Sequence, residues 1–437
     1  ILTAGLMIAG ATLTLLLSGV KFLSSFGPGL SVSVLIGAMV AISFVPAVLA
    51  IFGRTLFWPK GTDVFASPED EARRSEQARL VGFAAAHPLL ITLFCFVLLG
   101  AAASGIRLIS LGNPVIRGLP SWTAPREGYE AVSSELGPGV VGPTMLIVEE
   151  PGIAAKREAL QDLELRLLEQ PGVSAAIGPV EGLAAGRHGI FISPDGSAAR
   201  FALILDANPS TGDAVAALGG VEQRLPETLR LAGLGEATFK ATGDTTIASE
   251  LNSDTKQAFL RVTPVALAVL FVLLWALLRS RSAPIYLLAV SVLVVAAAIG
   301  LTVYVFQGLL GYGELAFFVP VAAAILLLAL GSDYNVFLIS RIWREAERRD
   351  LRPAIRTAGS RAARAITVAG VTLALSFAAV AIVPILSFRE LAFAMSVGLL
   401  LDTLVARTLL IPALVSLFGR GAPSKLESSA ASLSSSH

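Results

Sequence analysis

Residues 317–341 have the sequence FFVPVAAAILLLALGSDYNVFLISR. The stretch is apolar from Phe317 through Leu330, carries an acid at Asp333 and meets its first basic residue at Arg341. As a helix rising about 1.5 Å per residue, it is long enough to cross a hydrocarbon core of about 30 Å. The sequence therefore predicts a membrane-spanning helix over 315–340 with a carboxyl group inside it.

The rest of the chain has the same character. Of its 437 residues, 54% are hydrophobic and 15% are charged, whereas soluble domains carry about 25% charge. A chain this long and this apolar needs lipid as its solvent. We expect a polytopic α-helical membrane protein with about eight spans, the other stretches of sufficient length being 1–20, 28–53, 88–106, 259–278, 284–306, 365–386 and 391–418.

Basic residues close to the spans set the orientation, because they are retained on the cytoplasmic side. Outside the long insertion at 107–256, the loops of one side carry only Lys21 and Arg389. We therefore expect that side, with the insertion, to face the exterior or periplasm. The opposite, cytoplasmic side holds Arg54, Lys60, Arg73, Arg74, Arg79, Arg279, Arg281, Arg341, Arg344, Arg348, Arg349, Arg352, Arg356, Arg361 and Arg364.

The exterior segment 108–257 alternates strand and helix patterns. Strands are predicted at 143–149, 173–177, 200–205 and 238–242, and amphipathic helices at 154–169 and 212–232. Strand–helix–strand, given twice, predicts a ferredoxin-like α+β sandwich. We expect residues 111–128 to form an extended connection, and Asp244 and Glu250 to be solvated.

An internal repeat relates the two ends of the chain. Residues 44–54, FVPAVLAIFGR, match residues 410–420, LIPALVSLFGR, and repeats of this kind are common in transporters. Three more helices and an exterior domain precede the second copy only, so we expect the sequence to be the carboxy-terminal part of a longer chain. The expected segments are 1–54, the last two spans of a first half; 55–87, a cytoplasmic linker with an amphipathic helix; 88–107, a span; 108–257, a periplasmic domain; 258–420, a five-span bundle; and 421–437, a disordered tail.

Asp333 is the first candidate for function. A carboxylate within the bilayer costs at least about 2.5–3.5 kcal/mol on insertion scales, so it should face the bundle interior and have a partner. Such a group suits the loading and unloading of a proton. Tyr334 could donate a hydrogen bond to it or relay the proton, and Gly331 and Ser332 permit close approach of another helix. The alternative is an aspartate that only holds helices together.

Asp402 and Arg407 form a second polar pair, in the last predicted span. Residues five apart on an α-helix do not share a face, so we expect each to find its partner elsewhere. Arg407 could be a counter-ion for Asp333 or an anchor at the inner interface, and a structural role for the pair is equally compatible with the sequence. The first repeat has Ile36 and Ala41 at the matching positions, so the pair is special to the second copy.

Other chemistry finds little support. A net charge of +1 argues against a nucleic-acid partner held by bulk electrostatics. Cys95 is the single cysteine, and the three histidines lie far apart without metal-ligand spacing. No nucleophile–base pair is visible, so we expect neither an enzyme nor a cofactor or metal site.

The string FVPV at 318–321, followed by GSDYNVFL at 331–338, resembles the tenth span of MMPL exporters, a family within the RND superfamily. The resemblance covers the whole chain. It implies a twelve-helix protein of two pseudo-symmetric halves in the bacterial inner membrane, with a periplasmic porter domain in each half. Asp333 and Tyr334 match the second of two Asp-Tyr pairs that form a proton relay, the first pair lying in the missing amino-terminal half. Residues that would support the relay are Ser332, Phe337, Asp402 and Arg407.

The resemblance implies export of lipids or other hydrophobic molecules, driven by antiport of protons. One alternative is a proton-driven helper of protein export, similar to SecD/SecF. Another is a non-transporting membrane protein that senses lipids. The expected partners are a lipid or hydrophobic small molecule, protons, the membrane and the amino-terminal half of the protein.

Overall fold

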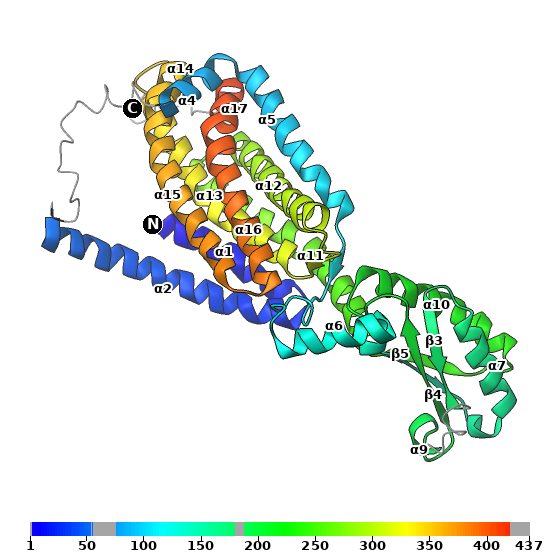
Figure 1. The fold of residues 1–437 in the computed structure, drawn as a ribbon. Helices are drawn as coiled ribbons and strands as arrows, with labels where there is room; N and C mark the ends of the chain where they lie inside the picture. Colours follow the sequence, from blue (N-terminus) through cyan, green and yellow to red (C-terminus); the bar gives the residue numbers. More distant parts are fainter. Residues whose placement is uncertain (1, 54, 56–75, 180–187, 420–437) are drawn as a thin grey trace, which may run out of the picture.

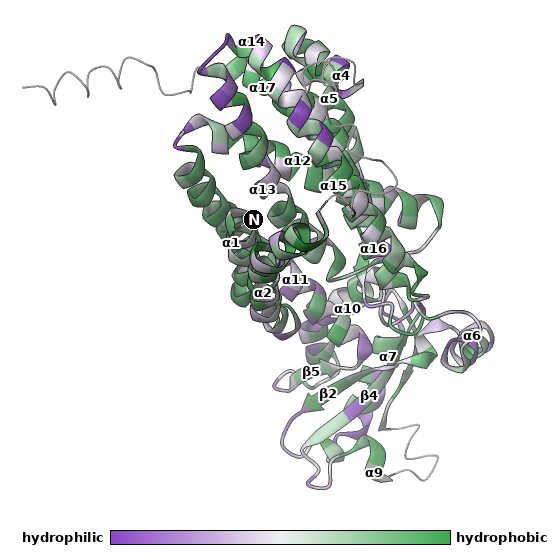
Figure 2. Cartoon of the chain, turned by 90° about the vertical axis from the view of Figure 1, so that its left-hand side faces the viewer, coloured by the Kyte–Doolittle hydropathy of each residue, from purple (hydrophilic) through white to green (hydrophobic). Residues whose placement is uncertain are grey.

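The computed structural model describes residues 2–53, 55, 76–179 and 188–419, and the side chain of Asp333 also lies outside the described part. The molecule is elongated, with a bundle of long helices at one end and an α+β domain at the other (Figure 1). Hydrophobic residues cover the bundle helices, whereas hydrophilic residues gather near α14 and in the α+β domain (Figure 2). The predicted tail 421–437 and most of the predicted linker 55–87 fall outside the described residues.

Seven helices of the described residues are long and apolar enough to cross a membrane. The predicted span 1–20 is instead the shorter apolar helix Leu2–Leu17, because Gly19 adopts a φ of 77° and turns the chain before α2. The bundle consists of α1 (Leu2–Leu13), α2 (Lys21–Phe52), α5 (Pro88–Ala103), α11 (Asp244–Leu278), α12 (Ser282–Val303), α13 (Val319–Ala346), α15 (Ser360–Ala379), α16 (Leu386–Leu400) and α17 (Ile411–Phe418).

Several of these helices continue into irregular turns, and short helices connect them. The turns Ser104–Leu108 after α5 and Val380–Ile382 after α15 are 3₁₀-helical, whereas Tyr304–Leu309 after α12 is π-helical. Two further π-helices, Ile355–Gly359 and Leu401–Leu410, join α14 (Leu351–Ala354) to α15 and α16 to α17. The amphipathic helix α4 (Glu76–Ala86) packs across the end of the bundle against the first of these π-helices.

Burial separates the helices into an inner and an outer set. α12, α13 and the segment α16–α17 form the buried centre, and α1 packs along α13. α2 packs on α1 and then leaves the bundle, so its apolar residues are exposed around its circumference (Figure 1). An apolar helix exposed in this way requires lipid or another membrane helix around it.

The α+β domain has the predicted topology. Its four antiparallel strands are β2 (Thr144–Glu149), β3 (Val173–Ile177), β4 (Ala198–Leu205) and β5 (Thr238–Thr242), in the spatial order β3-β4-β2-β5. That is the order of a ferredoxin-like sheet, and α7 (Arg157–Leu168) and α10 (Gly212–Leu231) supply the two crossover helices. Asp244 and Glu250 are exposed, as expected.

The connection before the sheet differs from the prediction. Residues 111–128 are not extended throughout, because α6 (Ala124–Leu136) begins within them, with Pro125 in its first turn. Pro is favoured there since its missing N–H has no partner in the first turn of a helix. The structure also contains a short helix, α9 (His188–Phe191), near the end of the sheet.

The domain and the bundle are joined by a continuous helix, a strand pair and a hydrogen bond. α11 starts directly after β5 and runs without a break into the bundle, whereas the sequence predicted a helix only from residue 259. The two-residue strand β1 (Leu111–Gly112) pairs in parallel with β6 (Leu315–Ala316), which precedes α13. Asn252 on α11 donates a hydrogen bond of 2.9 Å to the carbonyl of Leu111. Motion of α13 or α11 must therefore move the root of the domain.

Glycine allows the closest helix crossing in the bundle. A Cβ at Gly105 would lie 2.3 Å from the carbonyl oxygen of Gly300, so Gly105→Leu should cost about 1–3 kcal/mol or more through overpacking. Gly100→Leu is the control, because a Cβ at Gly100 meets nothing within 4 Å. We expect a lower melting temperature in detergent for the first variant only, and equal values for the two would contradict this packing.

Candidate functional site

The predicted site residues come from two neighbouring segments in the centre of the bundle. Ser332, Tyr334 and Phe337 lie on α13, as does the backbone of Asp333, whose side chain lies outside the described part of the structure. Asp402 and Arg407 lie on the π-helix Leu401–Leu410 that connects α16 to α17. The two polar groups singled out in the sequence are therefore brought together.

Arg407 is the residue that joins the two segments. Its side chain is 1% exposed, and it forms an ion pair with Asp402, which is also buried. Its Nη2 donates a hydrogen bond of 2.7 Å to the carbonyl oxygen of Gly331. Its guanidinium carbon lies 4.6 Å from the centre of the Tyr334 ring, a cation–π contact. Arg407 thus contacts the residues on both sides of Ser332 and Asp333.

The pairing of Asp402 with Arg407 corrects the prediction that they lie on different faces. The prediction assumed an α-helix, in which residues five apart diverge. A π-helix bonds residue i to i+5 and places those residues one above the other. The hydroxyl of Thr408 likewise donates a hydrogen bond of 2.9 Å to the carbonyl of Thr403, five residues earlier. π-helical turns occur frequently at functional sites.

Further polar groups around the pair have unused hydrogen-bonding capacity. Nε and Nη1 of Arg407 have no hydrogen-bond partner among the described residues. The same holds for both side-chain polar atoms of Asn335, which is 1% exposed on α13. Buried donors and acceptors are normally satisfied, so groups that are not satisfied mark a region built for more than packing.

A glycine on α15 lets that helix approach the site, whereas the glycine on α13 leaves room for a side chain. A Cβ at Gly331 would lie 3.6 Å from Nη2 of Arg407 and 3.7 Å from Asp402, which is ordinary contact. A Cβ at Gly370 on α15 would lie 2.2 Å from the hydroxyl of Thr403 and would force α15 away from the π-helix. The site is therefore closed on the α15 side by direct backbone packing.

The remaining predicted residues have other contacts. The hydroxyl of Ser332 donates a hydrogen bond of 2.6 Å to the carbonyl of Leu328 on its own helix. Phe337 lies under the guanidinium of Arg341, 4.4 Å from the ring centre, toward the basic end of α13. On α15, Thr372 and Ser376, which were not among the predicted site residues, donate hydrogen bonds of 2.8 and 2.9 Å to carbonyls four residues earlier. These hydroxyls satisfy their own backbone, as hydroxyls in helices commonly do.

The sequence analysis missed a second polar group, at the root of the α+β domain. Glu390 on α16 is fully buried, and its Oε2 accepts a hydrogen bond of 2.9 Å from the backbone N–H of Ala316 in β6. Its Oε1 has no partner among the described residues. Glu314 is also buried and forms a 3.0 Å ion pair with Arg117. The pKa of Glu314 is raised above its ordinary value, chiefly by burial. The positive charge of Arg117 opposes this shift, and the negative charge of Asp213 adds to it.

The position of Glu390 explains why it was missed. The predicted span began at residue 391, which left Glu390 in a loop, whereas the helix begins at Leu386. An acid at the start of an apolar run was the only available signal. No group of three or more histidine, cysteine, aspartate or glutamate side chains within the described ranges could hold a metal ion.

Comparison with known proteins gives a consistent result. The model of the MMPL family matches residues 1–79 and 146–431. A membrane protein of Streptomyces coelicolor, SCO5905, is 30% identical over 97% of this chain and 48% of its own length. The apo-petrobactin exporter of Bacillus anthracis is 27% identical over 94% of this chain and 56% of its own length. The sulfolipid-1 exporter MmpL8 of Mycobacterium tuberculosis is 31% identical over 53% of this chain and 21% of its own length. The chain spans about half the length of the relatives that it matches along most of its own length.

The ion pair between Asp402 and Arg407 predicts a specific pattern of stability. Arg407→Leu should cost about 3–5 kcal/mol, because it leaves Asp402 buried without its cation. Arg407→Leu combined with Asp402→Leu should cost less than Arg407→Leu alone, since no uncompensated charge remains. Unfolding in detergent measures the four corners of this double-mutant cycle. Strictly additive losses would show that the two side chains do not stabilise each other.

Proposed function

The chain belongs to the MMPL family, and on that premise we propose that it forms the carboxy-terminal part of a proton-driven exporter of lipids or other hydrophobic molecules. The contact of Arg407 with Asp402, Gly331 and Tyr334 carries the proposal. It places an acid, a phenol and a cation in the buried centre of a membrane-spanning bundle, beside the backbone of Asp333. In this mechanism Asp333 and Tyr334 exchange the proton, and Arg407 responds to the charge of Asp333.

The energy available from protons suits such a device. Moving one elementary charge across 100 mV is worth about 2.3 kcal/mol. A gap of a few kcal/mol separates the conformations of a typical two-state protein, so one or two protons shift its populations substantially. In this proposal the buried ion pair is the element that responds, because Arg407 lies beside the backbone of Asp333 and would be attracted more strongly toward an ionised Asp333 than toward a neutral one.

The fold transmits a shift of α13 to the α+β domain. α13 begins two residues after β6, and β6 pairs with β1 at the root of the domain. α11 packs along α13 and extends without a break to β5. We assign the basic side to the cytoplasm and residues 108–257 to the periplasm, where the domain would open and close a path for the exported molecule.

Apolar grooves on the surface of the bundle are compatible with a hydrophobic substrate. An open groove of about 860 Å³ lies between α5, α11 and α12 and is lined by residues such as Phe96, Phe271 and Val292. Another of about 310 Å³ lies where the bundle meets the domain, lined by residues such as Ile109, Phe259 and Pro320. Both fall within the usual size range of ligand pockets. Hydrocarbon chains fit such walls, and export is also the activity in the names of two relatives.

Removal of the exchangeable carboxyl tests the proposal. In the complete protein, Asp333→Asn should reduce export to the level of cells that lack the protein, because an amide cannot take up the proton. Asp254→Asn, an exposed acid on α11, is the matched control and should leave export unchanged. Export of a fluorescent lipid or lipophilic dye measures the effect, and the variants should be present in the membrane at equal amounts. Normal export by Asp333→Asn would refute the proton-driven mechanism.

The link through Glu390 makes a separate prediction. Glu390→Leu should leave the N–H of Ala316 buried without an acceptor, at a cost of about 1–3 kcal/mol. Glu390→Gln keeps an oxygen that can accept this hydrogen bond and should be milder, and exposed Arg389→Leu is a control. Hydrogen exchange of residues 111–112 and 315–316 should be faster in Glu390→Leu only. Unchanged exchange would show that Glu390 does not hold this junction.

A further inference from the structure

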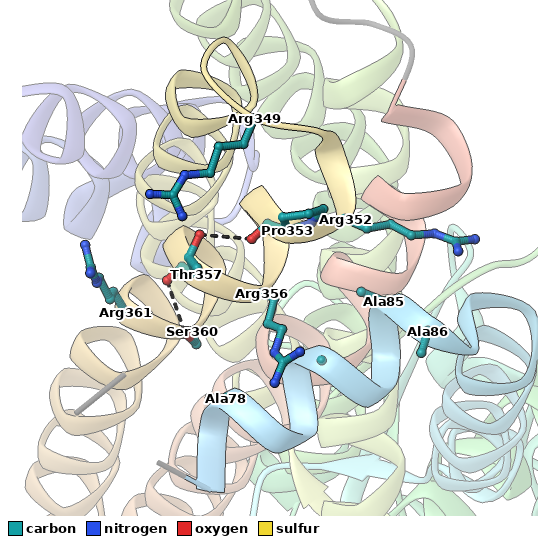
Figure 3. Close-up of a pocket in the computed structure, with 11 residues that line it drawn as sticks. Ala78, Ala85, Ala86, Arg349, Arg352, Pro353, Arg356, Thr357, Ser360 and Arg361 are labelled. Carbon is teal, nitrogen blue, oxygen red and sulfur yellow. Dashed lines mark hydrogen bonds between the residues drawn. The ribbon is translucent and has the colours of Figure 1, made fainter. Parts of the chain in front are cut away.

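A basic pocket lies at the end of the bundle remote from the α+β domain. Its volume is about 530 Å³, and it lies between α4 and the continuous segment formed by α14, the π-helix Ile355–Gly359 and α15. Four arginines line it, together with Thr357 and Ser360: Arg349, Arg352, Arg356 and Arg361. Figure 3 shows Arg356 extending from the π-helix toward α4, Arg352 on the side of Ala85, and Arg349 and Arg361 on the other side.

Three of the four arginines of this pocket have no ion-pair partner among the described residues. Arg349 forms a 3.2 Å ion pair with Glu345. Arg352, Arg356 and Arg361 form no ion pair with any residue in the described ranges. The hydroxyls of Thr357 and Ser360 donate to backbone carbonyls at 2.9 and 3.1 Å, so they leave only acceptor capacity in the pocket. Recognition of a ligand here therefore falls to the three arginines and requires an anion.

The wall opposite the arginines is made of small residues. α4 contributes Ala78, Gly82, Ala85 and Ala86 to the lining. A Cβ at Gly82 would lie 3.9 Å from the side chain of Arg356, so the absence of a side chain at this position helps to keep the pocket open. Arg352, Arg356 and Arg361 are themselves exposed, as basic residues that set the orientation of spans are, but they surround a concave surface. An open basic pocket bounded on one side by a second helix points to a bound group.

The outer face of α4 indicates where that group comes from. Val81 and Ala84 are buried against the bundle, whereas Leu80 and Phe83 are 46% and 50% exposed on the same short helix. Exposed leucine and phenylalanine on an amphipathic helix are typical of helices that lie in the membrane interface. The pocket therefore lies at the depth of lipid headgroups, on the basic side of the protein.

We propose that this pocket binds the phosphate group of an anionic phospholipid of the adjacent leaflet, with Arg356, which extends toward α4, at its centre and Arg352 and Arg361 at its two sides. Guanidinium groups recognise phosphate oxygens through paired hydrogen bonds, and basic pockets between membrane helices on the cytoplasmic side suit phospholipid headgroups. The acyl chains would extend from the pocket into the bilayer beside α4. The bound lipid would connect α4 to α15, and α4 also packs against the π-helix that carries Asp402 and Arg407.

The test is lipid-dependent stability of the complete protein in an uncharged detergent. Short-chain phosphatidylglycerol should raise the melting temperature saturably, and phosphatidylcholine of the same chain length should not. Arg352→Gln combined with Arg356→Gln should weaken the apparent affinity for phosphatidylglycerol about tenfold or more, since two charge-assisted contacts are lost. The matched control is Arg279→Gln with Arg281→Gln, which removes the same charge from the same side outside the pocket and should bind normally.

A second variant tests the shape of the pocket while leaving its charge unchanged. Gly82→Leu places a side chain in the pocket at ordinary contact distance from Arg356, so it should fold and should lose the lipid effect with all arginines intact. Equal loss in the control pair, or full binding by Gly82→Leu, would overturn the proposal in favour of diffuse attraction to a basic surface. Saturation by inorganic phosphate at the same concentrations as phosphatidylglycerol would overturn the lipid as the source of the phosphate.

Discussion

The ion pair between Arg407 and Asp402 is the interaction on which the rest of the bundle depends. Its two charges are buried, so each must be matched by the other and by hydrogen bonds. The carbonyl of Gly331 and the ring of Tyr334 complete the surroundings of the guanidinium. Because these groups belong to α13, the pair fixes the register between α13 and the last membrane-spanning segment.

The α+β domain is connected to the centre of the bundle by continuous or hydrogen-bonded segments. α11 is one continuous helix from the sheet into the bundle, and the β1–β6 pair and the Glu390 carboxylate hold the start of α13 against the root of the domain. A sheet is stiff, and a helix transmits displacement along its axis. The domain is therefore placed to follow the bundle rather than to move independently of it.

Two zones of charge serve different purposes in this chain. The inner zone, around Arg407, is enclosed and nearly neutral, so it suits a step in which one proton changes the balance. The zone at the end of α15 is open, strongly basic and covered by the amphipathic helix α4, so it suits a ligand that carries its own negative charge. α4, which borders the basic zone, also contacts the π-helix Leu401–Leu410 of the inner zone.

Seven of the eight expected spans and the ferredoxin-like sheet could be predicted from the sequence, because apolar length and the alternation of strands and helices are local properties, whereas the roles of the candidate site residues stay predictions. β3 and β5 have the predicted bounds, and the pair Asp402 and Arg407 stood out from apolar surroundings. Only the tertiary structure decided that these two residues pair with each other over Tyr334, since the π-helix that aligns them has no readable signal in the sequence. The bond of Glu390 to Ala316 and the closure of the arginine pocket by α4 likewise join segments distant along the chain, and such contacts are set by packing rather than by local pattern.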